Sequence, residues 1–185
     1  MKYIIVDLEA TCWKKKEKGQ KNEIIEIGAV AIDESGNELG EFAEFIKPKL
    51  NPLLSDFCKE LTSISQVDID AAQSFPEVLK AFQNWIGIEK DSYFLCSWGY
   101  YDKSQFEKDC KLHELDSLWL EPHISVKHQY AKINALPKPC GMARALSLEG
   151  MKLEGTHHRG IDDARNISRI FRKYLSDWDF SMKQN

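Results

Sequence analysis

The sequence lacks the features that mark secreted, membrane-spanning and zinc-binding proteins. The cysteines are odd in number and no C-x-x-C pair occurs, so neither a disulfide framework nor a zinc knuckle is indicated. No apolar run is long enough to cross a bilayer, and Asp7 interrupts the short N-terminal run, which argues against a signal peptide. We therefore expect reduced thiols, a cytoplasmic location and no membrane partner. The five cysteines are Cys12, Cys58, Cys96, Cys110 and Cys140.

An excess of positive charge is also absent. The formal net charge is −4, so the chain has no global basic signature of a passive nucleic-acid binder. This argument counts less against an enzyme whose acids hold cations, because a bound metal changes the local charge. The length of 185 residues and the lack of repeats favour one domain. We expect the domain to cover residues 1–178 and residues 179–185 to form a frayed tail.

Strand-like runs dominate the first part of the chain, and strands alternate with helices afterwards. This order predicts an α/β domain with a mixed sheet. Ser74 and Glu77 form a capping-box pattern, which predicts the start of a helix. The expected strands are Lys2–Glu9, Ile24–Ile32, Glu41–Ile46, Asp91–Ser97 and a shorter one near Pro122–Val126. The main later helices are expected at Asp102–Leu112, Lys127–Asn134, Met142–Leu148 and Ile161–Leu175.

The first strand ends in two acids separated by one residue, Asp7 and Glu9. Residues i and i+2 of a strand point to the same side, so both carboxylates should project together from a buried strand. Unpaired charge is costly there. Either the strand simply rises to the surface at this point, or the two carboxylates hold a divalent cation, which prefers oxygen ligands.

Two further aspartates fall on core-facing stripes of expected helices. Asp163 shares its stripe with Ile167 and Ile170, whereas Asp162 lies on the solvated stripe with Arg165. We therefore expect Asp163 to need a partner and Asp162→Ala to have little effect; the alternative is that Asp163 merely caps the helix.

Asp102 similarly falls with Phe106 on the inward side of its helix. It follows an expected strand, and sites in α/β proteins usually lie at strand ends. A role as the N-cap of the helix is the alternative explanation, and the two roles are compatible.

A histidine pair precedes the last helix in the stretch HHRGIDDA. His158 lies five residues before Asp163 across Gly160, and we expect this flexible link to let its ring fold back over the same site. His157 is the alternative, but this spacing would pair it with the outward-facing Asp162.

These motifs, in this order, resemble the DEDDh 3′–5′ exonucleases of the RNase T and DnaQ type, and most closely their Eri-type branch, which includes the three-prime histone mRNA exonuclease. The resemblance implies a ribonuclease H-like fold with a mixed five-stranded sheet flanked by helices. It covers nearly all of residues 2–172. The stretches that carry it are VDLEATCW, NEIIEIGAV, LSDFCKELTSI, SWGYYD, PCGMARAL and LEGTHHRGIDDARNI.

The resemblance also implies the roles of the site residues. His158 would be the general base, acting with a metal site that holds two Mg²⁺ or Mn²⁺ ions. The ligands of these ions would be Asp7, Glu9, Asp102 and Asp163. The backbone at Ala10 and Thr11 would contact the terminal nucleotide. Trp13 would either stack on a base or pack in its loop.

The substrate implied by the branch is single-stranded RNA, which would be cut from its 3′ end into nucleoside 5′-monophosphates. A DNA exonuclease of the repair or proofreading type and a non-catalytic nucleic-acid-binding module are the alternatives. Lys14, Lys15, Lys16 and Lys18 form the only dense basic cluster, which either holds phosphates or is a solvated loop. Long animal relatives carry an additional nucleic-acid-binding segment, which we do not expect before Asp7, and no obligate protein partner is evident.

Overall fold

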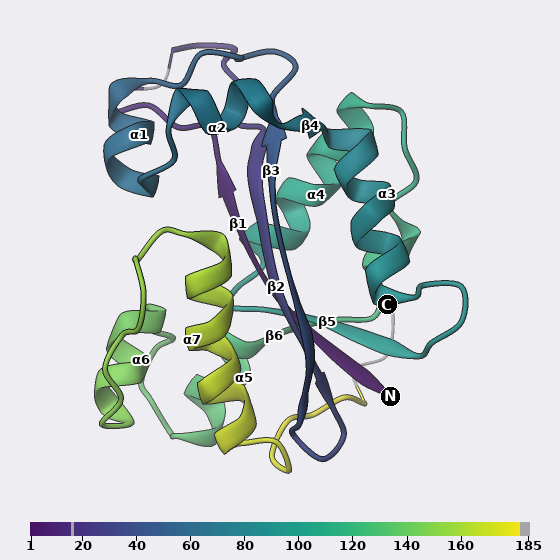
Figure 1. The fold of residues 1–185 in the computed structure, drawn as a ribbon. Coiled ribbons are helices and arrows are strands. Elements are labelled where there is room, and N and C mark those ends of the chain that lie inside the picture. The colour runs from purple at the N-terminus through teal and green to yellow at the C-terminus, as the bar shows by residue number, and fades with distance from the viewer. Residues whose placement is uncertain (16, 182–185) are drawn as a thin grey trace.

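Six strands form one mixed sheet in the order β4-β3-β2-β1-β5-β6 (Figure 1). The computed structural model describes residues 1–15 and 17–181. β1 occupies the centre, antiparallel to β2 on one side and parallel to β5 on the other. The strands are β1 (Lys2–Ala10), β2 (Ile24–Asp33), β3 (Glu38–Lys47), β4 (Gln73–Ser74), β5 (Tyr93–Ser97) and β6 (His123–Ser125).

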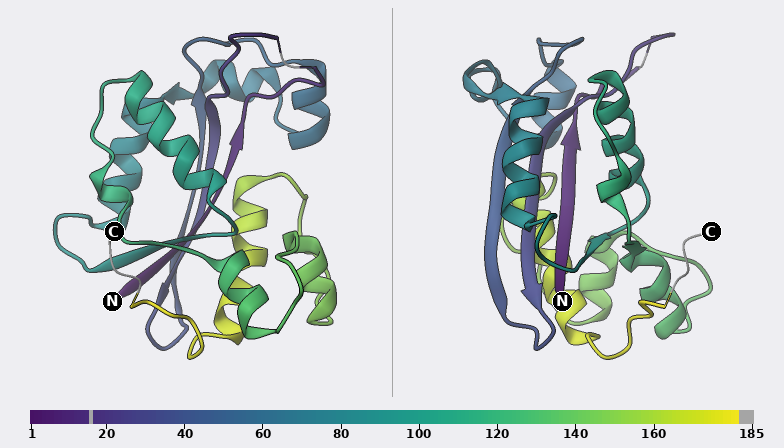
Figure 2. Two further views of the ribbon diagram at one scale, coloured as in Figure 1. Left: turned by 180° about the vertical axis from the view of Figure 1, so that it is seen from behind. Right: turned by 90° about the vertical axis from the view of Figure 1, so that its right-hand side faces the viewer.

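Helices cover both faces of this sheet (Figure 2). One hydrophobic cluster joins β1 and β2 to α3 and α4 through rings that include Phe82 and Phe106. The other joins β1 and β2 to α5, α6 and α7 through Tyr130 and Phe171. The helices are α1 (Asp56–Thr62), α2 (Gln66–Ala71), α3 (Phe75–Ile86), α4 (Tyr101–Leu112), α5 (Val126–Ile133), α6 (Met142–Leu148) and α7 (Gly160–Lys173), with a 3₁₀ turn η1 at Leu118–Leu120.

The α/β architecture predicted from the sequence is confirmed, and the Ser74–Glu77 capping box is present at the start of α3. The expected count of five strands was wrong by one. The additional strand is β4, in which Gln73 and Ser74 pair in parallel with Ile46 and Lys47 of β3. Gln73 and Ser74 are both polar and too few to show an alternating apolar pattern, and the sequence around Ser74 predicts a helix cap. The sequence pattern therefore does not predict this strand.

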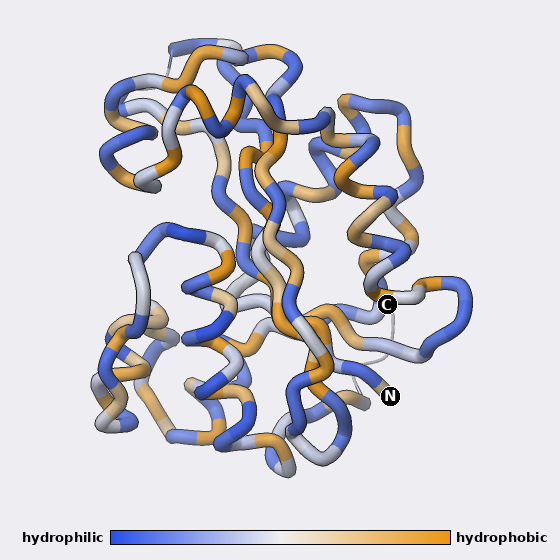
Figure 3. The backbone as a smooth tube through the Cα atoms, in the orientation of Figure 1, coloured by the Kyte–Doolittle hydropathy of each residue, from blue (hydrophilic) through white to orange (hydrophobic). Residues whose placement is uncertain are grey.

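The alternation of side chains along β1 divides the core into its two layers. Ile4 and Val6 pack into the cluster beneath α3 and α4, whereas Tyr3 and Ile5 pack into the cluster beneath α7. Helices with one buried face alternate between orange and blue along their length in Figure 3. Asp7 and Glu9 continue the row of Tyr3 and Ile5, so they lie on the α7 side of the sheet.

Gly28 and Gly160 bring the first turn of α7 directly onto the sheet. A Cβ atom added to Gly28 of β2 would lie 2.0 Å from the carbonyl carbon of Gly160 and 2.0 Å from the backbone nitrogen of Ile161. A Cβ added to Gly160 would lie 3.0 Å from the backbone oxygen of Asp7. Because Gly28 pairs with Asp7 across β1 and β2, this contact fixes where α7 begins relative to Asp7.

The C-terminal segment contacts the domain as far as it is described. Trp178 is buried, and its Nε1 donates a hydrogen bond of 2.8 Å to the carbonyl of Phe171. Within the tail predicted to fray, the ring of Phe180 stacks on Tyr3 at 4.7 Å, and residues 182–185 lie outside the described residues. All five cysteines are free. None of the described helices has the length and apolar character needed to cross a membrane.

Replacing Gly28 with Ala should destabilise the fold, because the added methyl group meets backbone atoms that cannot rotate away. We expect the free energy of unfolding to fall by about 3 kcal/mol, at the upper end of ordinary overpacking. Urea denaturation followed by circular dichroism measures this value. Gly141→Ala is the matched control, because a Cβ at Gly141 meets no atom within 4 Å. Equal stabilities of the two variants would show that the contact is not tight.

Candidate active site

Asp7 and Glu9 are brought together with Asp163 at one end of the sheet. Carboxylate oxygens of these three residues lie within 4.8 Å of one another. Glu9 and Asp163 are buried, so the first strand does not simply rise into solvent. Asp163 stands in the first turn of α7, which the Gly28–Gly160 contact holds over β1. The core-facing position predicted for Asp163 is therefore confirmed.

Asp102 joins this group from α4 and lines the same cleft. It lies in the first turn of α4 and is 6% exposed. Its Oδ1 accepts a hydrogen bond of 3.2 Å from the backbone N–H of Leu8, which ties the start of α4 to β1. The N-cap of α4 is Tyr100, so the alternative that Asp102 is the N-cap residue was wrong.

Burial raises the pKa values of three acids in this cluster, and repulsion between the carboxylates adds to the shift for Asp7 and Glu9. Burial, followed by the charges of Asp102 and Glu9, raises the pKa of Asp7 well above its ordinary value. Burial and the charge of Asp163 raise the pKa of Glu9 to about 8. Burial raises the pKa of Asp102 to about 6. Among the described residues, no lysine or arginine forms an ion pair with any of these carboxylates.

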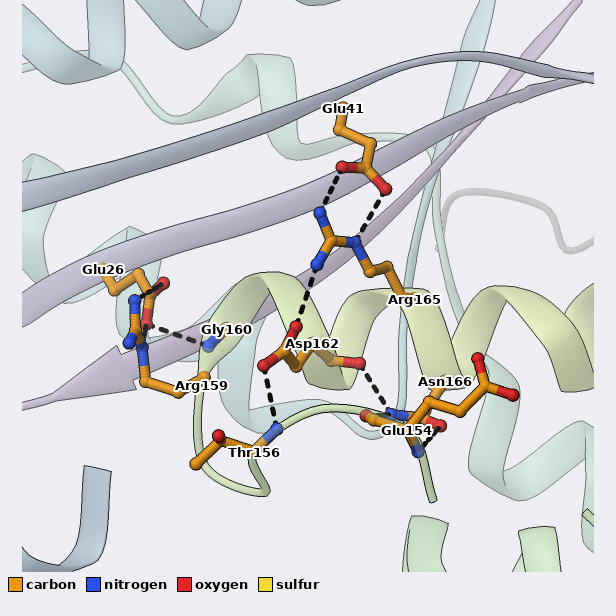
Figure 4. Close-up of polar contacts among 9 residues, drawn as sticks. All are labelled: Glu26, Glu41, Glu154, Thr156, Arg159, Gly160, Asp162, Arg165 and Asn166. Carbon is orange, nitrogen blue, oxygen red and sulfur yellow. Dashed lines mark hydrogen bonds and ion pairs between the residues drawn. The ribbon is translucent and has the colours of Figure 1, made fainter. Parts of the chain in front are cut away.

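Glu26 is a fifth buried acid beside the cluster, but it has its own partners (Figure 4). It pairs with Glu9 across β1 and β2. Its Oε2 accepts hydrogen bonds from the backbone N–H of Gly160 at 2.9 Å and from Nε of Arg159 at 3.2 Å. Glu26 thus anchors the start of α7 and is already compensated by a cation, whereas the other acids are not.

Both histidines of the HHRGIDDA stretch reach the cleft. The Nδ1 atom of His157 lies 3.0 Å from Oδ2 of Asp163, and the backbone N–H of His158 donates a 3.0 Å bond to the same oxygen. The two rings stack at 4.0 Å with an angle of 14°. The expected pairing of His157 with Asp162 was wrong. The chain turns back at His158, whose φ is +63°, and this turn directs both residues toward Asp163.

Asp162 instead holds the loop that carries the histidines (Figure 4). Its carboxylate accepts hydrogen bonds of 2.9 Å from the backbone N–H of Thr156 and from Arg165. Asn166 holds the same loop, because its side chain hydrogen-bonds both the backbone N–H and the carbonyl of Glu154. The solvated-stripe argument for Asp162 was wrong, since the preceding loop folds over that face of α7. We therefore no longer expect Asp162→Ala to be silent.

The site is a cleft of about 420 Å³ between the ends of β1 and β5 and the first turns of α4, α5, α6 and α7. Its lining includes all five residues predicted for catalysis and metal binding: Asp7, Glu9, Asp102, His158 and Asp163. Sequence reasoning missed several neighbours, of which Tyr101 and Lys127 are the most polar. Tyr101 directly precedes Asp102, which is a signal that could have been used. Lys127 follows β6, and no motif singles it out.

The residues predicted to contact the terminal nucleotide follow the cleft residue Glu9 along the chain. Of the described residues, Ala10, Thr11 and Trp13 are not among those that line it. Thr11 is buried, and its backbone N–H and its hydroxyl are both hydrogen-bonded to the backbone of Glu23. Lys14, Lys15 and Lys18 are exposed, and Lys16 lies outside the described residues.

Comparisons with known proteins agree with this site and fold. The profile of the RNase_T exonuclease family matches residues 4–171. Human 3′-5′ exoribonuclease 1 is 33% identical over 94% of this chain, and the chain spans about half (52%) of its length. The 3′-5′ exonuclease eri1 of Schizosaccharomyces pombe is 31% identical over 94% of this chain and 68% of its own.

A solved structure leads to the same conclusion. The nuclease domain of 3′hExo, described as a DEDDh family member bound to rAMP, superposes with a TM-score of 0.89 at 30% identity, covering 95% of this chain and 92% of that one. The fold, the family profile and the sequence identities agree with the resemblance drawn from the motifs. The chain belongs to the RNase T exonuclease family.

Proposed function

We propose that this chain is a divalent-metal-dependent 3′–5′ exonuclease that hydrolyses single-stranded RNA from a free 3′ end and releases nucleoside 5′-monophosphates. The observation that carries the proposal is the meeting of Asp7, Glu9, Asp102, Asp163 and two histidines in one cleft. Mere binding of RNA does not need buried acids that lack cationic partners. The names of the relatives, which include an exoribonuclease and a nuclease bound to rAMP, favour RNA over DNA.

The donor set fits hard divalent cations. Mg²⁺ and Mn²⁺ prefer carboxylate oxygens, and three of the carboxylates already have oxygens within 4.8 Å of one another. Burial raises the pKa values of Glu9 and Asp102, and neighbouring carboxylates add to the shift of Glu9; a bound cation would favour the ionised forms of both. We propose that Asp7, Glu9, Asp102 and Asp163 hold two such ions. When bound, they would lower the pKa of a water molecule and offset charge on the phosphate.

His158 is proposed as the general base that takes the proton of the attacking water. Burial and the neighbouring His157 lower its pKa, which favours the neutral imidazole that can accept a proton at pH 7. His157 already uses Nδ1 on Asp163, so its ring is better suited to support Asp163 and to stack on His158. The substrate contacts proposed for Ala10, Thr11 and Trp13 rest on the family resemblance.

A cleavage assay tests the proposal directly. Single-stranded RNA and DNA of matching sequence, both labelled at the 5′ end, are incubated with Mg²⁺, Mn²⁺ or a chelator. We expect a ladder of 3′-shortened RNA with either cation, and none with chelator or with Asp102→Asn. Asp116→Asn, an exposed acid away from the cleft, is the control and should retain activity.

Each other outcome of this assay has a definite meaning. A ladder on DNA alone would indicate a DNA exonuclease of the repair or proofreading type. Retarded RNA without any ladder would favour a binding module. If Asp102→Asn cleaved RNA as fast as wild type, Asp102 would not be a metal ligand.

The two histidines should differ in their effects on turnover. His158→Ala is expected to lower kcat by roughly 10²- to 10⁴-fold, the usual contribution of a general base. His157→Ala should lower it less, because the proton acceptor remains. Single-turnover rates on the same RNA, with folding checked by circular dichroism, measure both. A larger loss for His157→Ala than for His158→Ala would exchange the two roles.

A further inference from the structure

A second hollow of about 390 Å³ is lined in part by residues that directly neighbour cleft residues along the chain. Along the chain, Gly99 and Tyr101 line the cleft, while Tyr100 between them lines the second hollow. In the same way, Lys127 lines the cleft and His128 lines the hollow. The backbone N–H of Lys127 donates a 2.9 Å hydrogen bond to the carbonyl of Trp98, which joins these two segments of the chain.

Two aromatic rings are presented in this hollow. Tyr100 is 50% exposed, and its ring stacks on the exposed His128 with centroids 5.0 Å apart and an angle of 29°. The Ser125 hydroxyl lies 2.6 Å from Nδ1 of His128 and fixes the orientation of that imidazole. Neither ring is needed to fill the core. Oriented, half-exposed rings beside a nucleic-acid site are typical platforms for a nucleobase.

The charges around the hollow favour a base over a phosphate. Two carboxylates, Asp177 and Asp179, and one cation, Lys132, are among its lining residues, so a phosphate would meet an excess of negative charge there. Lys127, in contrast, faces the cleft, and no described acid forms an ion pair with it. A bound RNA strand would therefore place a phosphate near Lys127 and a base on the rings of Tyr100 and His128.

We propose that the hollow binds the base of the nucleotide immediately upstream of the bond to be cleaved, stacked on Tyr100 and His128. This subsite rests on the proposed exonuclease function and deepens it. A base engaged in a double helix could not stack there, so the subsite would favour single strands. Because every base has a π-face, it would not discriminate strongly among sequences.

The test is a double-mutant cycle in which one change is made in the protein and the other in the RNA. Wild type and Tyr100→Ala are each assayed on a short single-stranded RNA and on the same RNA with an abasic unit at the penultimate position. We expect each change alone to raise KM about 5- to 100-fold, as for loss of one base–aromatic stack. The two changes together should cost no more than the abasic unit alone. Tyr100→Phe keeps the ring and should behave as wild type.

Controls separate a subsite from a general effect on folding. Leu118→Ala truncates an 80% exposed side chain away from the hollow and should leave KM unchanged. Moving the abasic unit further upstream should not reproduce its effect. Additive costs of Tyr100→Ala and the abasic unit, or an unchanged KM in Tyr100→Ala, would overturn the subsite.

Failure of the proposed exonuclease function can be told apart from failure of the subsite. If wild type cleaves no RNA with either cation, the exonuclease proposal fails. Fluorescence anisotropy of the same labelled RNAs then tests the subsite by affinity in the same cycle. Equal affinities of wild type and Tyr100→Ala for the intact RNA would overturn it.

Discussion

The backbone contact between Gly28 and Gly160 is the constraint on which the candidate active site depends. Acids on β1 and an acid on α7 can meet only if the helix begins directly on the sheet, and a side chain at Gly28 would occupy that space. Glu26 secures the same position by binding the backbone N–H of Gly160 and the guanidinium of Arg159. A local packing requirement therefore determines where Asp163 stands relative to Asp7.

The buried acids of this region fall into two kinds, which differ in their partners. Glu26 is paired with Arg159 and contributes to structure. Asp7, Glu9 and Asp102 have no such cation among the described residues, so their ionised forms oppose folding. Unpaired buried charge of this kind clusters at functional sites, where an ion or substrate supplies the missing partner.

Periodicity was enough to predict which acids face inward, because β1 alternates and α4 and α7 each bury one face. Asp7, Glu9, Asp102 and Asp163 therefore meet as expected. The same reasoning failed for Asp162 and His157, since a helical stripe does not show that a loop will fold over its outer side. Tyr100 of the proposed subsite was missed for a related reason: it lies between β5 and α4, where no periodicity predicts which side chains are exposed.

The melting temperature of the protein with and without Mn²⁺, at about pH 6 and about pH 8.5, shows directly whether the buried acids bind a cation. Glu9 has a folded pKa of about 8 against an ordinary value of 4.5, so its stabilising neutral form is lost as pH rises through about 8. We expect the chelated protein to melt at a lower temperature at the higher pH. Mn²⁺ near 100 times its Kd should restore stability by about 2.7 kcal/mol, a rise in melting temperature of roughly 5–10 °C. A melting temperature that Mn²⁺ leaves unchanged at both pH values would contradict cation binding by these acids.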